Sequence, residues 1–197
     1  MGPVLRTGWT VAVLLCALAL PAGGQVLETR LGLGQPIGEF AEITGVGPTA
    51  SVGLEFRLGS RLGALVRGGA EFLSDVQAWH YLAGLRLHAL GEEDDDWRLA
   101  VSIGGGGTTF SREDRVQIPE APPPRESQLE TSWTLMAGLE VGRAVSPAVE
   151  VYVFADWLLM FTDGDTLFGS DPELVSEGFG ELSSIPFGIA LRWSWPQ

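Results

Sequence analysis

The residues of this chain best suited to acid–base chemistry are its two histidines, His80 and His88. They lie, together with Arg86, inside the apolar stretch AWHYLAGLRLHAL, residues 78 to 90. Histidine acts as a general acid or base and binds metal ions, but catalysis would also need a nucleophile and an orienting acid at the same place. Asp75 and Asp156 are acids that could reach His80, and the sequence marks out no serine as its partner. We therefore expect no catalytic residues and no enzyme.

Three other segments resemble ligand sites without completing one. The acidic run 92–96 could hold divalent cations, but such runs usually form solvated turns. The segment 163–165 begins like a calcium loop, yet Leu167 and Phe168 stand where a ligand and a glycine are required. No helix is expected after the glycines 104–107, so they do not form a phosphate-binding loop. The sequence predicts neither a metal ion nor a cofactor.

The spacing of polar residues in the stretch 78–90 identifies the element that must hold the histidines. At helical spacing Arg86 falls on the same stripe as Trp79 and Leu82 and interrupts it. At a period of two, Trp79 and the odd positions after it form one apolar face, whereas His80, Arg86 and His88 share the opposite face. The stretch is therefore predicted to be a strand with one apolar and one polar face.

The same alternation recurs along the chain in eight segments, an even number, which predicts an all-β fold. The expected strands are 26–34, 49–58, 64–73, 78–90, 97–111, 131–145, 149–161 and 184–195. The connections 35–48, 113–130 and 162–183 are long and fall at one end, with the short connection 74–77. The connections at the other end, 59–63, 91–96 and 146–148, are all short. This asymmetry is typical of an eight-stranded antiparallel up-and-down transmembrane β-barrel.

The first 24 residues are predicted to be a cleaved secretory signal peptide. The uncharged run from Trp9 to Leu20 follows Arg6 and is too short to span a bilayer as a helix. Small residues precede Gln25, where cleavage is expected, so the barrel domain comprises residues 25–197. Cys16, the single cysteine, lies in the leader, and the remaining chain needs no disulfide.

The aromatic residues of the apolar face predict two girdles, one at each end of the strands. Amphipathic rings at two heights match the two interfaces of a bilayer, whereas a soluble core would place its aromatic residues centrally. The expected girdle residues are Phe72, Trp79, Trp133, Trp157 and Phe161 toward the long loops, and Phe56, Trp97, Trp193 and Trp195 toward the short turns.

The polar face carries nearly balanced charges that are predicted to point into the barrel and pair there. An eight-stranded barrel is just wide enough for its interior to be filled by side chains. The predicted lumenal network consists of Glu28, Arg30, Glu55, Arg57, Arg67, Glu71, His80, Arg86, His88, Arg98, Glu140, Glu150, Asp156 and Arg192. The net charge of the whole chain is −13, which argues against a nucleic-acid partner, because phosphates would repel it.

Two motifs make the chain similar to the small eight-stranded outer-membrane β-barrel proteins of the OmpA/OmpX-like family. Gly34-Gln35-Pro36-Ile37-Gly38-Glu39-Phe40 resembles the Pro-x-Gly-acid-Phe stretch that follows the first strand in this family. Gly188-Ile189-Ala190-Leu191-Arg192-Trp193 resembles the last-strand signal recognised by the barrel assembly machinery, although Pro186 and the trailing Pro196-Gln197 depart from it. The resemblance implies a location in the bacterial outer membrane, contact with outer-membrane lipid and passage through that machinery.

The family has no single activity, so the expected role rests on the plugged lumen and the loops. We expect a structural or surface-interaction protein whose surface ligand, if it has one, binds the loops 113–130 and 162–183. The alternatives are a narrow, porin-like pore for small solutes, a lipid-modifying outer-membrane enzyme, and a secreted soluble β-barrel or sandwich.

Overall fold

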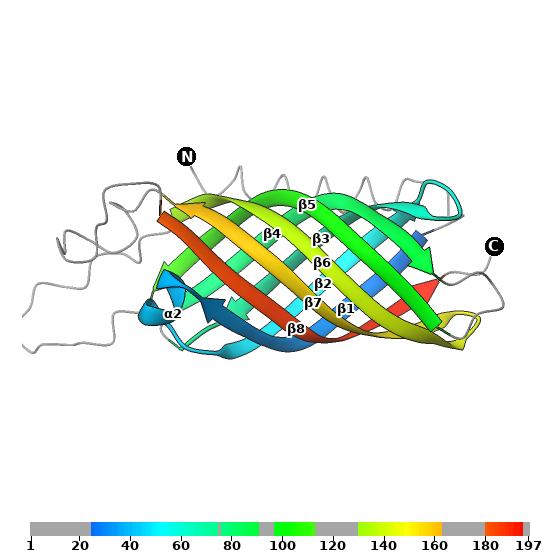
Figure 1. Cartoon of the computed structure of the whole chain (residues 1–197), viewed down its shortest axis with the longest axis horizontal. Helices are drawn as coiled ribbons and strands as arrows, with labels where there is room; N and C mark the ends of the chain where they lie inside the picture. Colours follow the sequence, from blue (N-terminus) through cyan, green and yellow to red (C-terminus); the bar gives the residue numbers. More distant parts are fainter. Residues whose placement is uncertain (1–24, 75, 91–96, 113–129, 163–179, 195–197) are drawn as a thin grey trace, which may run out of the picture.

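The computed structural model describes residues 25–74, 76–90, 97–112, 130–162 and 180–194, and these form a closed barrel of eight strands (Figure 1). The only helix within these residues is short. In chain order the elements are β1 (Gln25–Ile37), α2 (Glu39–Ile43), β2 (Gly47–Arg57), β3 (Leu62–Phe72), β4 (Val76–Leu90), β5 (Trp97–Arg112), β6 (Glu130–Ser146), β7 (Val149–Thr162) and β8 (Gly180–Ser194). The predicted all-β class and the number of strands are confirmed.

Each strand pairs antiparallel with the next one in the sequence, and β8 closes the barrel against β1. Closure leaves no strand with an unpaired edge, and an unpaired edge would otherwise recruit other chains. All eight predicted segments coincide with strands, but β1 extends to Ile37 and β8 begins at Gly180. The connections that they flank are therefore shorter than the sequence suggested.

The two faces of the wall are inverted relative to a soluble protein. Leu135 and Val153 are 54% and 65% exposed on the outer face, whereas Arg86 is completely buried inside. The predicted alternation of apolar outward and polar inward residues is therefore confirmed for these strands. Among the residues that the structure describes, no helix has the length and apolar character needed to cross a membrane.

Most of the predicted girdle residues stand on the outer face near strand ends. Phe72, Trp79, Trp133 and Phe161 lie near the strand ends at the long-loop end of the barrel, and the rings of Phe72 and Trp79 meet edge to face at 5.9 Å. Phe56, Trp97 and Trp193 lie near the opposite ends. Trp157 departs from the prediction, because it stands near the middle of β7. Trp195 lies outside the described residues.

A short helix turns the chain over one end of the barrel, where the sequence predicted only a loop. β1 ends at Ile37, and Gly38 adopts a φ of 60°, a left-handed conformation that favours glycine. The following turn forms α2, which lies at one end of the barrel in Figure 1 and whose Phe40 is 1% exposed. The Phe40 ring packs edge to face against Phe110, with ring centroids 6.2 Å apart.

Phe40 belongs to a cluster of buried apolar side chains at the long-loop end, which we call the apolar cap. Inward-facing residues at the ends of β4, β5, β7 and β8 supply most of its other members. The apolar cap consists of Phe40, Leu73, Val76, Ala78, Phe110, Met160 and Leu182. A smaller apolar cluster of Leu65, Leu82, Met136 and Leu158 lies deeper in the barrel.

We expect Phe40→Ala to lower the free energy of unfolding by about 3 kcal/mol, because removing a buried phenyl ring leaves a cavity in the apolar cap. Urea titration of the protein in detergent micelles measures this change. The matched control is Phe187→Ala on the outer face, where the ring is 42% exposed and a smaller loss is expected. Equal losses in the two variants would contradict the assignment of Phe40 to the apolar cap.

Candidate functional site

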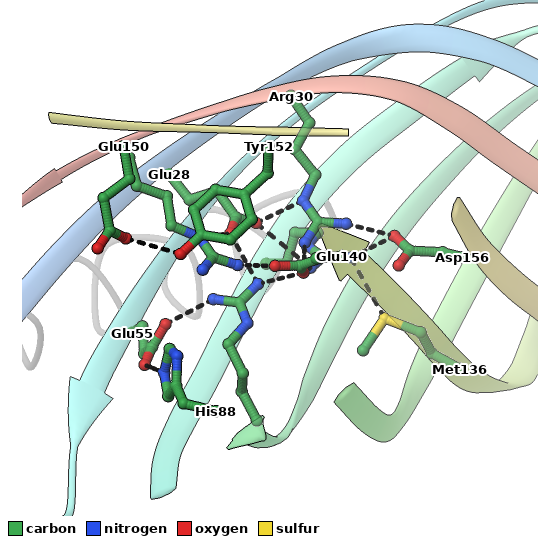
Figure 2. Close-up of polar contacts among 12 residues, drawn as sticks. Glu28, Arg30, Glu55, His88, Met136, Glu140, Glu150, Tyr152 and Asp156 are labelled. Carbon is green, nitrogen blue, oxygen red and sulfur yellow. Dashed lines mark hydrogen bonds and ion pairs between the residues drawn. The ribbon is translucent and has the colours of Figure 1, made fainter. Parts of the chain in front are cut away.

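The centre of the lumen holds a buried cluster of four arginines and four carboxylates, which we call the charge cluster (Figure 2). Its members come from β1, β2, β3, β4, β6, β7 and β8, because the inward positions of these strands meet on the barrel axis. The side chains are Glu28, Arg30, Glu55, Arg67, Arg86, Glu140, Asp156 and Arg192, all buried.

Glu28 and Glu140 connect most of the charge cluster, because each accepts hydrogen bonds from several guanidinium groups. Glu28 accepts from Arg30 at 2.5 Å, from Arg86 at 2.7 Å and from Arg192 at 2.8 Å. Glu140 accepts from the same three arginines, with a distance of 2.7 Å to Arg86. Residues from β1, β4, β6 and β8 are thereby tied together across the lumen.

Two further carboxylates complete the charge cluster on either side. Asp156 accepts from Arg30 and from Arg67, both at 2.6 Å and both through Oδ2. Glu55 accepts from Arg86 at 2.6 Å through one oxygen and contacts His88 Nε2 at 2.6 Å through the other. Hydrogen bonds between charged groups are stronger than hydrogen bonds between neutral groups. Such bonds hold the arginine side chains from several sides.

Aromatic rings cover two of these guanidinium groups. Arg192 lies 4.0 Å from the centroid of the Tyr152 ring, and Arg30 lies 4.6 Å from that of Phe154. Both rings project inward from β7, and such cation–π contacts stabilise a desolvated guanidinium. Neither Tyr152 nor Phe154 was among the residues predicted for the lumenal network.

The electrostatic condition for the charge cluster is neutrality. Removing one partner from a buried ion pair leaves an uncompensated charge and costs several kcal/mol. Four positive groups face four negative ones here, and every one of them has at least one opposite partner within 2.8 Å.

A second polar chain lies between the charge cluster and the apolar cap. His80 Nε2 contacts Glu71 at 3.0 Å, and His80 Nδ1 contacts the Thr108 hydroxyl at 2.8 Å. Thr108 in turn bonds Thr134 at 2.6 Å, and Ser184 donates to Glu71 at 2.7 Å. The partner of His80 is therefore Glu71, whereas the sequence pointed to Asp75 or Asp156; Asp75 lies outside the described residues.

The order Glu71, His80, Thr108 places an acid, a base and a hydroxyl in series, but the hydroxyl is not accessible. Thr108 is 0% exposed, and the neighbouring inward residue of β5 toward the strand end, Phe110, belongs to the apolar cap. The described residues also contain no group of three or more histidine, cysteine, aspartate or glutamate side chains that could hold a metal ion.

The predicted network loosens at the short-turn end of the lumen. Arg98 and Glu150 form a half-buried pair with atoms 3.6 Å apart, and the Tyr152 hydroxyl donates to Glu150 at 2.9 Å. His88 is likewise half-buried. The prediction was wrong for Arg57, which is exposed, because it is the last residue of β2 and its inward position lies at the rim.

Three solved structures resemble this barrel closely enough to compare. Neisserial surface protein A gives a TM-score of 0.64 at 11% identity, covering 89% of this chain and all of that protein. This chain has the fold of the small eight-stranded outer-membrane β-barrels. The N-terminal barrel domain of Pseudomonas aeruginosa OprF gives 0.51 at 9% identity, covering 86% of this chain and 98% of that domain.

The outer membrane protein OprG of Pseudomonas aeruginosa gives a TM-score of 0.50 at 11% identity, covering 87% of this chain and 97% of that protein. At such identities the likeness concerns the fold alone. No protein-family model matches the sequence, and no curated protein matches it.

We expect Glu140→Gln to lower the free energy of unfolding by about 3–5 kcal/mol, because it leaves the buried arginines around it with an excess positive charge. Glu150→Gln is the matched control at the rim, where the loss should be about 0–1 kcal/mol, since that pair is half-buried and long. Urea titration in detergent micelles compares the two. Similar losses would show that the position of Glu140 within the charge cluster is unimportant.

Proposed function

We propose that the protein is an integral outer-membrane β-barrel with a structural or surface-interaction role, and that its lumen is plugged. The observation that carries this proposal is the inverted wall: apolar side chains cover the outside while four ion-paired arginines are sealed inside. Water would not stabilise such a surface, whereas the hydrocarbon of a bilayer would.

The packing of the lumen supports a plug in preference to a pore. The charge cluster links residues from seven of the eight strands across the axis, and the apolar cap closes the long-loop end above it. A permeating ion would have to separate buried ion pairs and then cross an apolar layer. The burial of Thr108 likewise favours a role without catalysis over a lipid-modifying enzyme.

The connections after β5 and β7 are the segments that we propose for recognition. The strand pairs that flank them run as far as Thr162 with Gly180 and Phe110 with Glu130, so the barrel does not depend on the intervening chain for its register. The similar Neisserial protein is named as a surface protein. We propose that any surface ligand contacts the loops 113–130 and 162–183, and that lipid surrounds the wall between the girdles.

We expect an epitope tag inserted within residues 163–179 to be detected by antibody on intact cells. A tag between Ser146 and Val149, in the short turn before β7, should be detected only after the outer membrane is permeabilised, because the two connections lie at opposite ends of the barrel. Flow cytometry measures both, and heat-dependent gel mobility checks that each tagged barrel is folded. Detection of the second tag on intact cells would contradict the proposed orientation.

We expect the protein to show no conductance in planar lipid bilayers, because in our proposal the charge cluster and the apolar cap together block the lumen. A variant with Glu28, Arg86, Glu140, Arg192 and the apolar-cap residue Phe40 all replaced by alanine removes two charges of each sign and a large ring of the apolar cap, so it should conduct. This variant is the positive control for insertion. Open-channel currents from the unchanged protein would favour the narrow pore instead.

A further inference from the structure

The barrel wall has a defect where β7 faces β8. Residue pairs form a regular ladder up to Ala155 with Phe187 and resume at Leu158 with Ser184, but the two pairs between them, at Asp156 and Trp157, are missing. Pro186 stands opposite Asp156 at this point. Proline has no N–H group, so it cannot donate to β7, and proline is rarely found inside a sheet for this reason.

A small cavity in the lumen adjoins this defect. Its volume is about 30 Å³, and Pro186, Asp156 and Leu158 form part of its wall. The opposite wall carries polar groups from β2, β3 and β4. The polar residues that line the cavity are Thr49, Ser51, Arg67, Glu71, His80 and Asp156.

Two charged residues of the cavity wall have capacity for further hydrogen bonds. Asp156 Oδ1 and Arg67 Nε are buried, and neither has a partner among the residues that the structure describes, although both side chains pair with each other through other atoms. Asp156 and Arg67 are 3% and 6% exposed. Buried polar atoms without partners are uncommon and often bind ordered water.

We propose that this cavity is a binding site for ordered water, which supplies the hydrogen bonds that Pro186 cannot provide. A volume of about 30 Å³ holds about two water molecules, each of which needs two to four polar partners. The hydroxyl of Ser51, the guanidinium of Arg67 and the oxygens of Asp156 offer them. Within the proposed membrane the hydrocarbon outside the wall offers no substitute, so water must come from the lumen.

Water in this cavity also connects two polar networks. None of the contacts described above joins these networks directly. Arg67 and Asp156 belong to the charge cluster, whereas Glu71 and His80 belong to the chain beneath the apolar cap, and all four line the cavity. Water is favoured over a cation because the charge cluster is already balanced and the cavity contains the guanidinium of Arg67.

The test is to detect water contacts at the methyl groups of Leu158 by nuclear Overhauser spectroscopy of the protein in lipid nanodiscs. Leu82→Phe adds volume to a residue that lines the cavity and should abolish the contacts. Leu65→Phe is the matched control, because Leu65 belongs to the same apolar cluster but does not line the cavity. It should retain them.

Absence of water contacts in the unchanged protein, or their persistence in Leu82→Phe, would overturn the proposal. A dependence of the contacts on whether sodium or choline is the cation would assign the cavity to an ion and overturn it as well. None of these results depends on where the protein resides in the cell.

Pro186→Ala provides a second measurement that does not rely on added volume. It restores an N–H group opposite Asp156, so amide hydrogen exchange around residues 156–158 should slow about tenfold as the local ladder closes. Pro48→Ala is the control, since Pro48 lies at the exposed start of β2. Unchanged exchange in Pro186→Ala would show that the wall has no defect for water to compensate.

Discussion

Charge neutrality inside a narrow barrel is the constraint on which the rest of this structure depends. A lumen of eight strands has little room for bulk water, so each buried guanidinium must find a carboxylate or remain at high energetic cost. Glu28 and Glu140 satisfy three arginines between them, two from the adjacent strands β1 and β8 and one from the distant strand β4. The ion pairs thus connect the strands across the lumen. Their geometry requires the strand register that places these residues at the same position along the barrel axis.

Glycines make the space that the large lumenal side chains occupy. A Cβ atom on Gly142 would stand 2.6 Å from the Tyr152 ring, and one on Gly63 would stand 2.5 Å from Glu55 Oε1. A real side chain at either position would push the ring off Arg192 or the carboxylate off Arg86. The glycines of the wall are therefore part of the electrostatic arrangement, because they determine how closely the charged groups approach one another.

The sequence was sufficient to predict the strands and their faces, because a wall between lipid and a polar interior requires alternation at every second residue. It also placed Glu28, Arg86 and Glu140 on one face. It could not show that His80 pairs with Glu71, since that contact depends on the register of β3 against β4. The alternation along β2 predicts an inward side chain for Arg57, but this residue lies at the rim. Alternation shows which face of the wall a residue occupies, not how far along the barrel axis it lies. The helix α2 depends on the packing of Phe40 against Phe110, and the two residues are distant in the sequence.

The pairing of β1 with β8 has a consequence for the order of events in biogenesis. Glu28 near the N-terminal end of the barrel receives a hydrogen bond from Arg192, 164 residues later, and the same two strands form the closing seam. Most of the barrel is built from hairpins of neighbouring strands, but this seam has the longest possible loop to close and must wait for the last strand. A ribosome that stops before residue 180 would release a chain with two open strand edges and without Arg192, so the carboxylates of the charge cluster would outnumber its arginines by one.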